Sequence, residues 1–165
     1  ESIVQLEKLQ KQISTSNLTD ENPALCLAKW INNTPLIYYP AGLQAVALRF
    51  KNSLQENAKT HVITEDVIET SHNGIVAWER SSKVQPILLR GIDDNIKTKE
   101  RWEIFKEYFK KNGIESKEIF SVKGNIISKI VNLIYLLDYA SIYLAIKMKT
   151  DPTPVNSIDF IKSKL

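Results

Sequence analysis

The sequence predicts an α/β domain, a three-layer α-β-α sandwich built around a parallel sheet. Short apolar runs alternate with segments of helical periodicity, which is the pattern of a sheet covered by helices on both faces. The length of 165 residues suits one domain of ordinary size. Hydrophobic residues make up 43% and charged residues 25%, enough for a core and a polar surface.

The first half of the chain is expected to contain two helices, a strand and a third helix. Apolar side chains at Leu6, Leu9 and Ile13 predict an amphipathic first helix, with residues 1–20 forming a helix and linker and 21–165 the domain proper. Asn22 followed by a proline predicts the cap of a helix that runs to Trp30. "TPLIYYPAG" predicts a buried strand, and the following helix has apolar positions at 43, 46, 47, 50, 54 and 58.

The second half is expected to contain two more buried strands and three more helices. Pro86 is tolerated in the strand "VQPILLR" at a start or an edge, and Gly113 is a suitable left-handed helix stop. The expected elements are a strand at 84–90, a helix at 97–112, a strand at 118–122, a long apolar helix from Asn125 and a short terminal helix in "NSIDFIKSKL".

Ligands of open parallel sheets bind outside the carboxyl ends of the strands. We therefore expect a site near "PAG" after the first strand, near the segment around His72, and near "RGIDD" at 90–94.

The charge pattern argues against several classes of protein. The net charge of +3 comes from 22 basic and 19 acidic residues spread along the chain, which does not favour a nucleic-acid partner. The first residues are charged and amphipathic, unlike a signal peptide. Charged residues interrupt the apolar segment 126–148, so we expect a buried helix and no membrane partner. With Cys26 as the single cysteine, a disulfide within the chain is impossible, and a cytoplasmic setting is expected.

The sequence also contains no recognisable metal or cofactor motif. Its two histidines, His61 and His72, lie eleven residues apart (72 − 61 = 11) without an accompanying carboxylate pattern. Neither a P-loop nor a GxGxxG motif is present. We expect no metal and no cofactor.

Glu56 is a candidate catalytic base. It lies near the end of the helix that begins at Leu43, about 120° around the helix axis from Phe50 and therefore off the apolar stripe. The negative end of the helix dipole disfavours an ionised carboxylate there, which would suit a proton acceptor working near neutral pH. A solvated glutamate at a helix end is the alternative.

His72 is a second candidate. It lies in "TSHNG", where Thr70 or Ser71 would cap a short helix beginning near Asn73. The dipole of such a helix would keep the imidazole neutral and able to accept a proton. A histidine that only caps the helix or fills space is the alternative.

Separated motifs in this chain resemble one known family. "ALRFKNSLQENAKTHVITEDVIETSHNGIVAWE" and "DYASIYLAIKMKTDPTPVNSIDFIKSKL" are similar to the C-terminal half of the bifunctional phosphoglucose/phosphomannose isomerases, which are built from sugar isomerase (SIS) domains. The resemblance extends from about Asn22 to the end, and it is weakest between Ser81 and Asn125.

The resemblance implies an aldose-ketose isomerase that interconverts glucose 6-phosphate or mannose 6-phosphate with fructose 6-phosphate. Glu56 and His72 match the catalytic glutamate and histidine of the family, sixteen residues apart (72 − 56 = 16). Lys162 aligns with a lysine near the ring oxygen, with a solvated lysine as the alternative. Asn57 and Asn73 would support the two catalytic residues in substrate binding.

The resemblance also implies partners. The histidine in this superfamily typically comes from the neighbouring subunit, so a homodimer is expected. The phosphate-binding loop of these isomerases lies in a first SIS domain, and these 165 residues contain no such loop. We therefore expect the chain to work with an N-terminal SIS domain. A non-catalytic sugar-phosphate-binding or assembly module is the alternative function.

Overall fold

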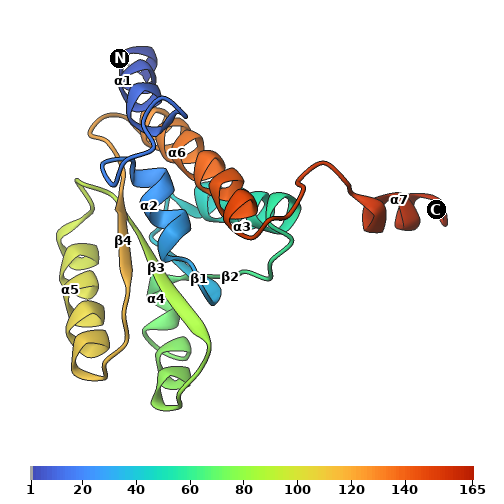
Figure 1. Ribbon diagram of the computed structural model, residues 1–165. Helices are drawn as coiled ribbons and strands as arrows, with labels where there is room; N and C mark the ends of the chain where they lie inside the picture. The colour runs from blue at the N-terminus through green and yellow to red at the C-terminus, as the bar shows by residue number, and fades with distance from the viewer. Residues whose placement is uncertain (1) are drawn as a thin grey trace.

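The computed structural model describes residues 2–165 as one α/β unit with a projecting C-terminal helix (Figure 1). Its elements in chain order are α1 (Ser2–Ile13), α2 (Pro23–Trp30), β1 (Thr34–Tyr39), α3 (Gln44–Asn57), β2 (Ile63–Asp66), α4 (Val67–Thr70), the 3-10 helix η1 (Gly74–Glu79), β3 (Val84–Arg90), α5 (Ile96–Lys111), β4 (Lys117–Phe120), α6 (Ile126–Lys147) and α7 (Asn156–Lys162).

The four strands form one parallel sheet in the order β2-β1-β3-β4, which confirms the predicted sheet type. Pro86 lies opposite Leu36 of β1, while the pairing of β3 with β4 begins only at Ile87. The proline therefore lies before the ladder on the β4 side, where the absence of its N–H costs little.

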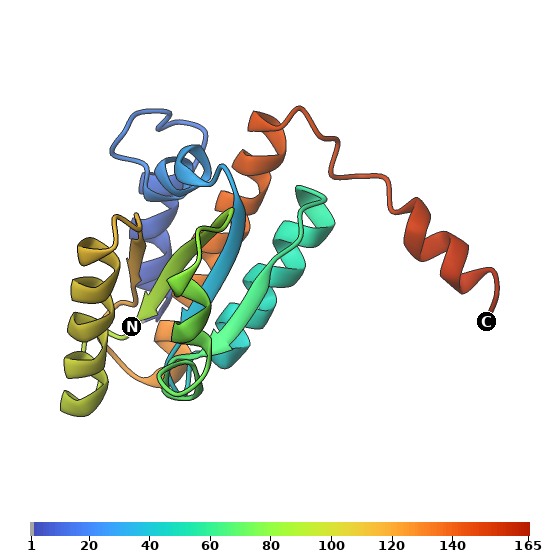
Figure 2. The same ribbon diagram turned by 90° about the horizontal axis from the view of Figure 1, so that it is seen from below.

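Helices cover both faces of the sheet and make three layers, as predicted (Figure 2). Alternate strand residues point to opposite faces. Ile37 and Ile87 lie in a core with α1, α2, α3 and α6, which we call the first core. Tyr38 and Leu88 lie in a second core with α4, η1 and α5. All six predicted apolar positions of the helix from Leu43 are buried in the first core.

Helix α6 is long and apolar enough to span a membrane by length and composition. It instead packs against α1, α2 and α3, and half of its most apolar window is buried inside the domain. This packing explains its composition and agrees with the predicted core helix. Asn125 caps its start by accepting a hydrogen bond from the backbone N–H of Ser128 (2.9 Å).

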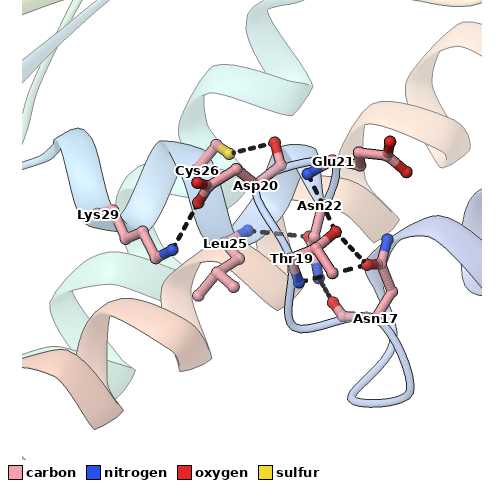
Figure 3. Close-up of polar contacts among 8 residues, drawn as sticks. All are labelled: Asn17, Thr19, Asp20, Glu21, Asn22, Leu25, Cys26 and Lys29. Carbon is pink, nitrogen blue, oxygen red and sulfur yellow. Dashed lines mark hydrogen bonds and ion pairs between the residues drawn. The ribbon is translucent and has the colours of Figure 1, made fainter.

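Asn22 organises the connection between α1 and α2 (Figure 3). Its side-chain oxygen accepts from the N–H of Leu25 (2.9 Å), which is the predicted cap. Its amide nitrogen donates to the carbonyls of Ile13 (3.1 Å) and Asn17 (2.8 Å). Because the fully buried side chain serves both helices, it fixes the angle at which α1 enters the first core.

The region between α3 and β3 differs from the prediction. Strand β2 was not expected, because three of its four residues "ITED" are polar and it lies at the sheet edge. The expected cap by Thr70 or Ser71 was wrong. Asp66 caps α4 instead, and the hydroxyls of Thr70 and Ser71 donate to the carbonyls of Asp66 and Val67 one turn earlier. The next helix, η1, begins without a side-chain cap.

Helix α7 leaves the body of the domain after a short connection and projects away from it (Figures 1 and 2). None of its residues is buried. Ile158 and Ile161 are exposed on it, so much of its apolar surface is open to solvent in the part of the chain that the structure describes.

Candidate functional site

Glu56 lies in the last turn of α3, exposed and facing a cavity of about 740 Å³. One wall of this cavity is α3, and the other is the segment that leads into α7. The lining residues are Asn52, Gln55, Glu56, Lys59, Asp151, Pro154, Val155, Asn156, Ser157 and Ile158. A carboxylate there can reach a bound molecule, which the predicted base requires.

The backbone around Glu56 is held by residues far away in the sequence. Asn57 Nδ2 donates to Ser141 Oγ on α6 (2.8 Å). Lys59 Nζ donates to the carbonyl oxygens of Glu56 (2.6 Å), Pro152 (3.3 Å) and Pro154 (2.7 Å). One lysine thus ties the end of α3 to the opposite wall of the cavity.

His72 lies in the turn between α4 and η1, exposed, with Asn73 exposed beside it. Local contacts shape this turn. The N–H groups of His72 and Asn73 donate to the carbonyl of Glu69 (2.9 and 3.3 Å), and Asn73 Nδ2 donates to its carboxylate (2.9 Å). The imidazole of His72 makes no hydrogen bond to any of the residues 2–165.

The fold places Glu56 and His72 at opposite ends of the parallel strands, Glu56 near the amino ends and His72 near the carboxyl ends. β1 ends at Tyr39, and α3 then runs back for 14 residues, about 20 Å, toward the amino ends of the strands, where β2 begins. His72 follows the carboxyl end of β2 and α4, on the other face. The segment around His72 thus lies at the carboxyl ends of the strands, as expected, whereas Glu56, which was not among the positions expected there, lies near their amino ends. Within one chain the two side chains do not meet.

Arg90, at the carboxyl end of β3, is the first residue of the "RGIDD" segment. Its guanidinium pairs with Glu118 and with Glu103 (3.1 Å) and lies over the ring of Phe120 (5.0 Å). Two carboxylates already compensate its charge, so Arg90 serves the packing of β3, β4 and α5 better than it would serve an anionic ligand.

Lys162 is exposed on α7. The first turn of that helix, from Asn156 to Ile158, lines the cavity at Glu56. The lysine therefore belongs to a helix that starts at this cavity and then leaves the domain.

Comparison with known proteins extends this picture. Residues 20–165 match the family model of the bacterial phospho-glucose isomerase C-terminal SIS domain. The chain belongs to this family. Two curated relatives are both named bifunctional phosphoglucose/phosphomannose isomerase. The one from Caldicellulosiruptor bescii is 32% identical over all of this chain and 50% of its own length. The one from Aquifex aeolicus is 26% identical over 79% of this chain and 42% of its own length.

Solved structures with this SIS fold show the same relation of lengths. A glucose-6-phosphate isomerase like protein from Thermus thermophilus superposes with a TM-score of 0.74 at 19% identity, over 90% of this chain and 51% of that one. The C-terminal domain of a glucosamine-fructose-6-phosphate aminotransferase from Francisella tularensis gives 0.61 at 15%, over 90% and 45%. The chain spans about half the length of the curated relatives it matches.

Sequence reasoning missed the residues that hold Glu56 in place. Lys59 follows it in "ENAK", and Ser141 lies in "DYAS" 85 residues later (141 − 56 = 85). Both motifs carried the family resemblance, but neither pattern indicates a contact between them. Only the packing of α3 on α6 reveals it.

Proposed function

We propose that this chain is the C-terminal catalytic half of an aldose-ketose isomerase that interconverts glucose 6-phosphate, and mannose 6-phosphate, with fructose 6-phosphate. Membership of the SIS family and the names of the relatives support this class of activity. The observation that carries the proposal is the carboxylate of Glu56, which opens into a cavity at the end of α3.

Glu56 acts as the base in this proposal. Its carboxylate removes the proton from the carbon next to the carbonyl, and the sugar passes through a cis-enediol in its singly deprotonated form, in which the remaining hydroxyl proton moves from the oxygen of that carbon to the former carbonyl oxygen. The same carboxylate then returns the proton to the neighbouring carbon. The exposed position of Glu56 supports access of the sugar, and Asn57 beside it supports its placement.

His72 opens the sugar ring by moving protons at the ring oxygen and the anomeric hydroxyl. Because His72 and Glu56 of one chain lie at opposite ends of the parallel strands, the histidine comes from a second copy in a homodimer. Asn73, which pairs with Glu69 in the same turn, supports the histidine loop.

Lys162 approaches the ring oxygen from α7. The start of this helix at the cavity of Glu56 supports the assignment. In this proposal an N-terminal SIS domain binds the phosphate group and closes the open side of the cavity. The twofold greater length of the relatives supports this division.

The decisive experiment replaces Glu56 by Gln in the chain joined to its N-terminal domain. Interconversion of fructose and glucose 6-phosphates should fall by about 10³-fold or more, because a general base typically contributes 10² to 10⁴. Glu107→Gln on α5, an exposed glutamate away from the cavity, is the matched control and should leave turnover unchanged. Unchanged turnover in Glu56→Gln would remove the proposal.

A non-catalytic sugar-phosphate-binding module is the second candidate. The separation of Glu56 from His72 in one chain favours it, because binding does not require the two residues to meet. Calorimetry with fructose 6-phosphate, together with deuterium exchange at the second carbon, separates the two functions. Binding without exchange selects the module.

A further inference from the structure

Two residues of the motifs, Arg49 and Ser53, have no part in the proposed chemistry, and they lie on the same helix face as Asn57. Arg49, Ser53 and Asn57 lie four residues apart on α3 and therefore form one stripe along that helix. Asp138 and Ser141 lie three residues apart on α6. The stripe of α3 faces this pair, and the contacts between them form a polar seam in an otherwise apolar helix interface.

Asp138 is the centre of this seam. Its two carboxylate oxygens accept from Arg49 Nε (3.1 Å) and Nη2 (2.9 Å), a bidentate pair with defined geometry. Ser53 Oγ donates to the same carboxylate (2.6 Å). Two successive turns of α3 are thereby held in one rotational setting against α6.

Ser141 extends the seam to the end of α3. Its hydroxyl donates to the carbonyl of Asp138 (2.7 Å) and accepts from Asn57 Nδ2 (2.8 Å), so both of its hydrogen-bonding functions are used. Ser141 is fully buried. Asn57 is the last residue of α3 and follows Glu56 directly, at the point where a free helix end would fray.

We propose that Ser141 and Asp138 are positioning residues, which hold the last turn of α3 in the rotation that aims the Glu56 carboxylate at the substrate carbon. This inference rests on the proposed function of Glu56. A shift of about 1 Å in a reacting group costs on the order of 10²-fold in rate, so a loosened last turn slows proton transfer while substrate binding elsewhere persists.

The main test compares two buried serines of α6 in the chain joined to its N-terminal domain. Ser141→Ala removes the contact to Asn57. Ser128→Ala is the matched control, because Ser128 is equally buried on the same helix and its hydroxyl lies 2.6 Å from that of Ser2, remote from Glu56. We expect kcat to fall about tenfold in Ser141→Ala with KM within about twofold, and both constants to stay unchanged in Ser128→Ala.

An isotope effect separates positioning from general loosening of the fold. With glucose 6-phosphate deuterated at the second carbon, proton transfer should become more rate-limiting in Ser141→Ala, so its primary isotope effect on kcat should exceed that of the wild type and of Ser128→Ala. Asp138→Asn, which keeps the shape but weakens the pair with Arg49, should shift kcat and the isotope effect in the same direction, by less.

A double-mutant cycle completes the test. In an Asn57→Ala background, Ser141→Ala should cause little further loss, because the contact is already gone. Additive losses, or an isotope effect unchanged in both Ser141→Ala and Asp138→Asn, would overturn the inference even if Glu56→Gln is inactive. A fully active Glu56→Gln enzyme would instead overturn the proposed function itself.

Discussion

The two ends of the candidate site are built in different ways. The Glu56 end is held by residues more than 80 positions away, through Ser141 on α6 and through the carbonyls that Lys59 bridges. The turn that carries His72 is shaped by contacts within five residues, between Glu65 and Asn73. The first end is therefore fixed by the fold of one chain, while the second is a local turn presented at the surface. Such a turn suits a group delivered to another molecule.

Complementation in mixed dimers tests whether Glu56 and His72 of one site come from different subunits, and it should give the largest effect. Glu56→Gln and His72→Ala should each be nearly inactive alone. Mixing and reassembling them should restore activity to about a quarter of the wild-type value, because half of random dimers are mixed and each has one intact site. The assay is fructose 6-phosphate isomerisation before and after exchange of subunits. No recovery despite proven exchange would place both residues in one chain's site.

The tie between η1 and the sheet should matter for the His72 end only. Trp78 Nε1 donates to the hydroxyl of Tyr38 (2.8 Å), and burial raises the pKa of that hydroxyl, so it stays protonated. Tyr38→Phe leaves the buried Trp78 N–H unpaired and should cost about 1 to 3 kcal/mol in the free energy of unfolding. Urea denaturation measures this loss.

The matched control is Tyr108→Phe, because Tyr108 packs against the same second core. Its stability should stay within about 0.5 kcal/mol of the wild type. In the Tyr38→Phe enzyme, isomerisation from the cyclic sugar should slow more than proton exchange on an open-chain analogue. Equal losses in the two assays would contradict a link between η1 and ring opening.

Lys59 is the corresponding tie at the Glu56 end. Replacing it by Met removes three hydrogen bonds to carbonyls but leaves the apolar stem, so we expect a loss of at most about 1 kcal/mol at this exposed position. Amide hydrogen exchange in residues 150–156 should speed up, since this segment loses its contact with α3. Lys110→Met on α5 serves as the control and should leave that exchange unchanged.

The smallest effect is expected at Gly74, where η1 begins. A Cβ added there would come within 2.4 Å of Glu65 Oε2 and 3.0 Å of Thr70 Cγ2. The Glu65 carboxylate ends a flexible side chain and can move aside, so Gly74→Ala should cost under about 1 kcal/mol. The change should also break the hydrogen bond from Thr70 to Glu65 (3.0 Å). A loss above about 2 kcal/mol in thermal unfolding would show that this turn is more rigid than its local contacts indicate.

Periodicity and capping residues were sufficient to predict most of the fold. The buried stripe of α3, the Asn22 cap, the start of α6 near Asn125 and the stop at Gly113 are local signals, and each appears in the structure. Strand β2 was missed because it is a four-residue strand at the sheet edge with three polar residues, which gives no clear apolar alternation. Without β2, the chain direction between Asn57 and His72 could not be followed.

The candidate residues could be named from motifs, but their arrangement could not. Helix α3 runs antiparallel to β1, and β2 then runs parallel to β1. Glu56 and His72 therefore lie at opposite ends of the strands. The seam from Arg49 to Ser141 depends on how α3 rotates against α6, which the packing of buried side chains decides and no short motif encodes.

The hydrogen bonds of Lys59 to the segment before α7 limit the distance between Lys162 and the cavity at Glu56. From the bonded carbonyl of Pro154, two extended residues and about two turns of α7 reach to Lys162, a span of roughly 15 to 20 Å. Helix α7 is thus joined to the cavity by a short connection. The ammonium group of Lys162 therefore stays at a high effective concentration around the cavity at Glu56, whichever surface α7 packs against.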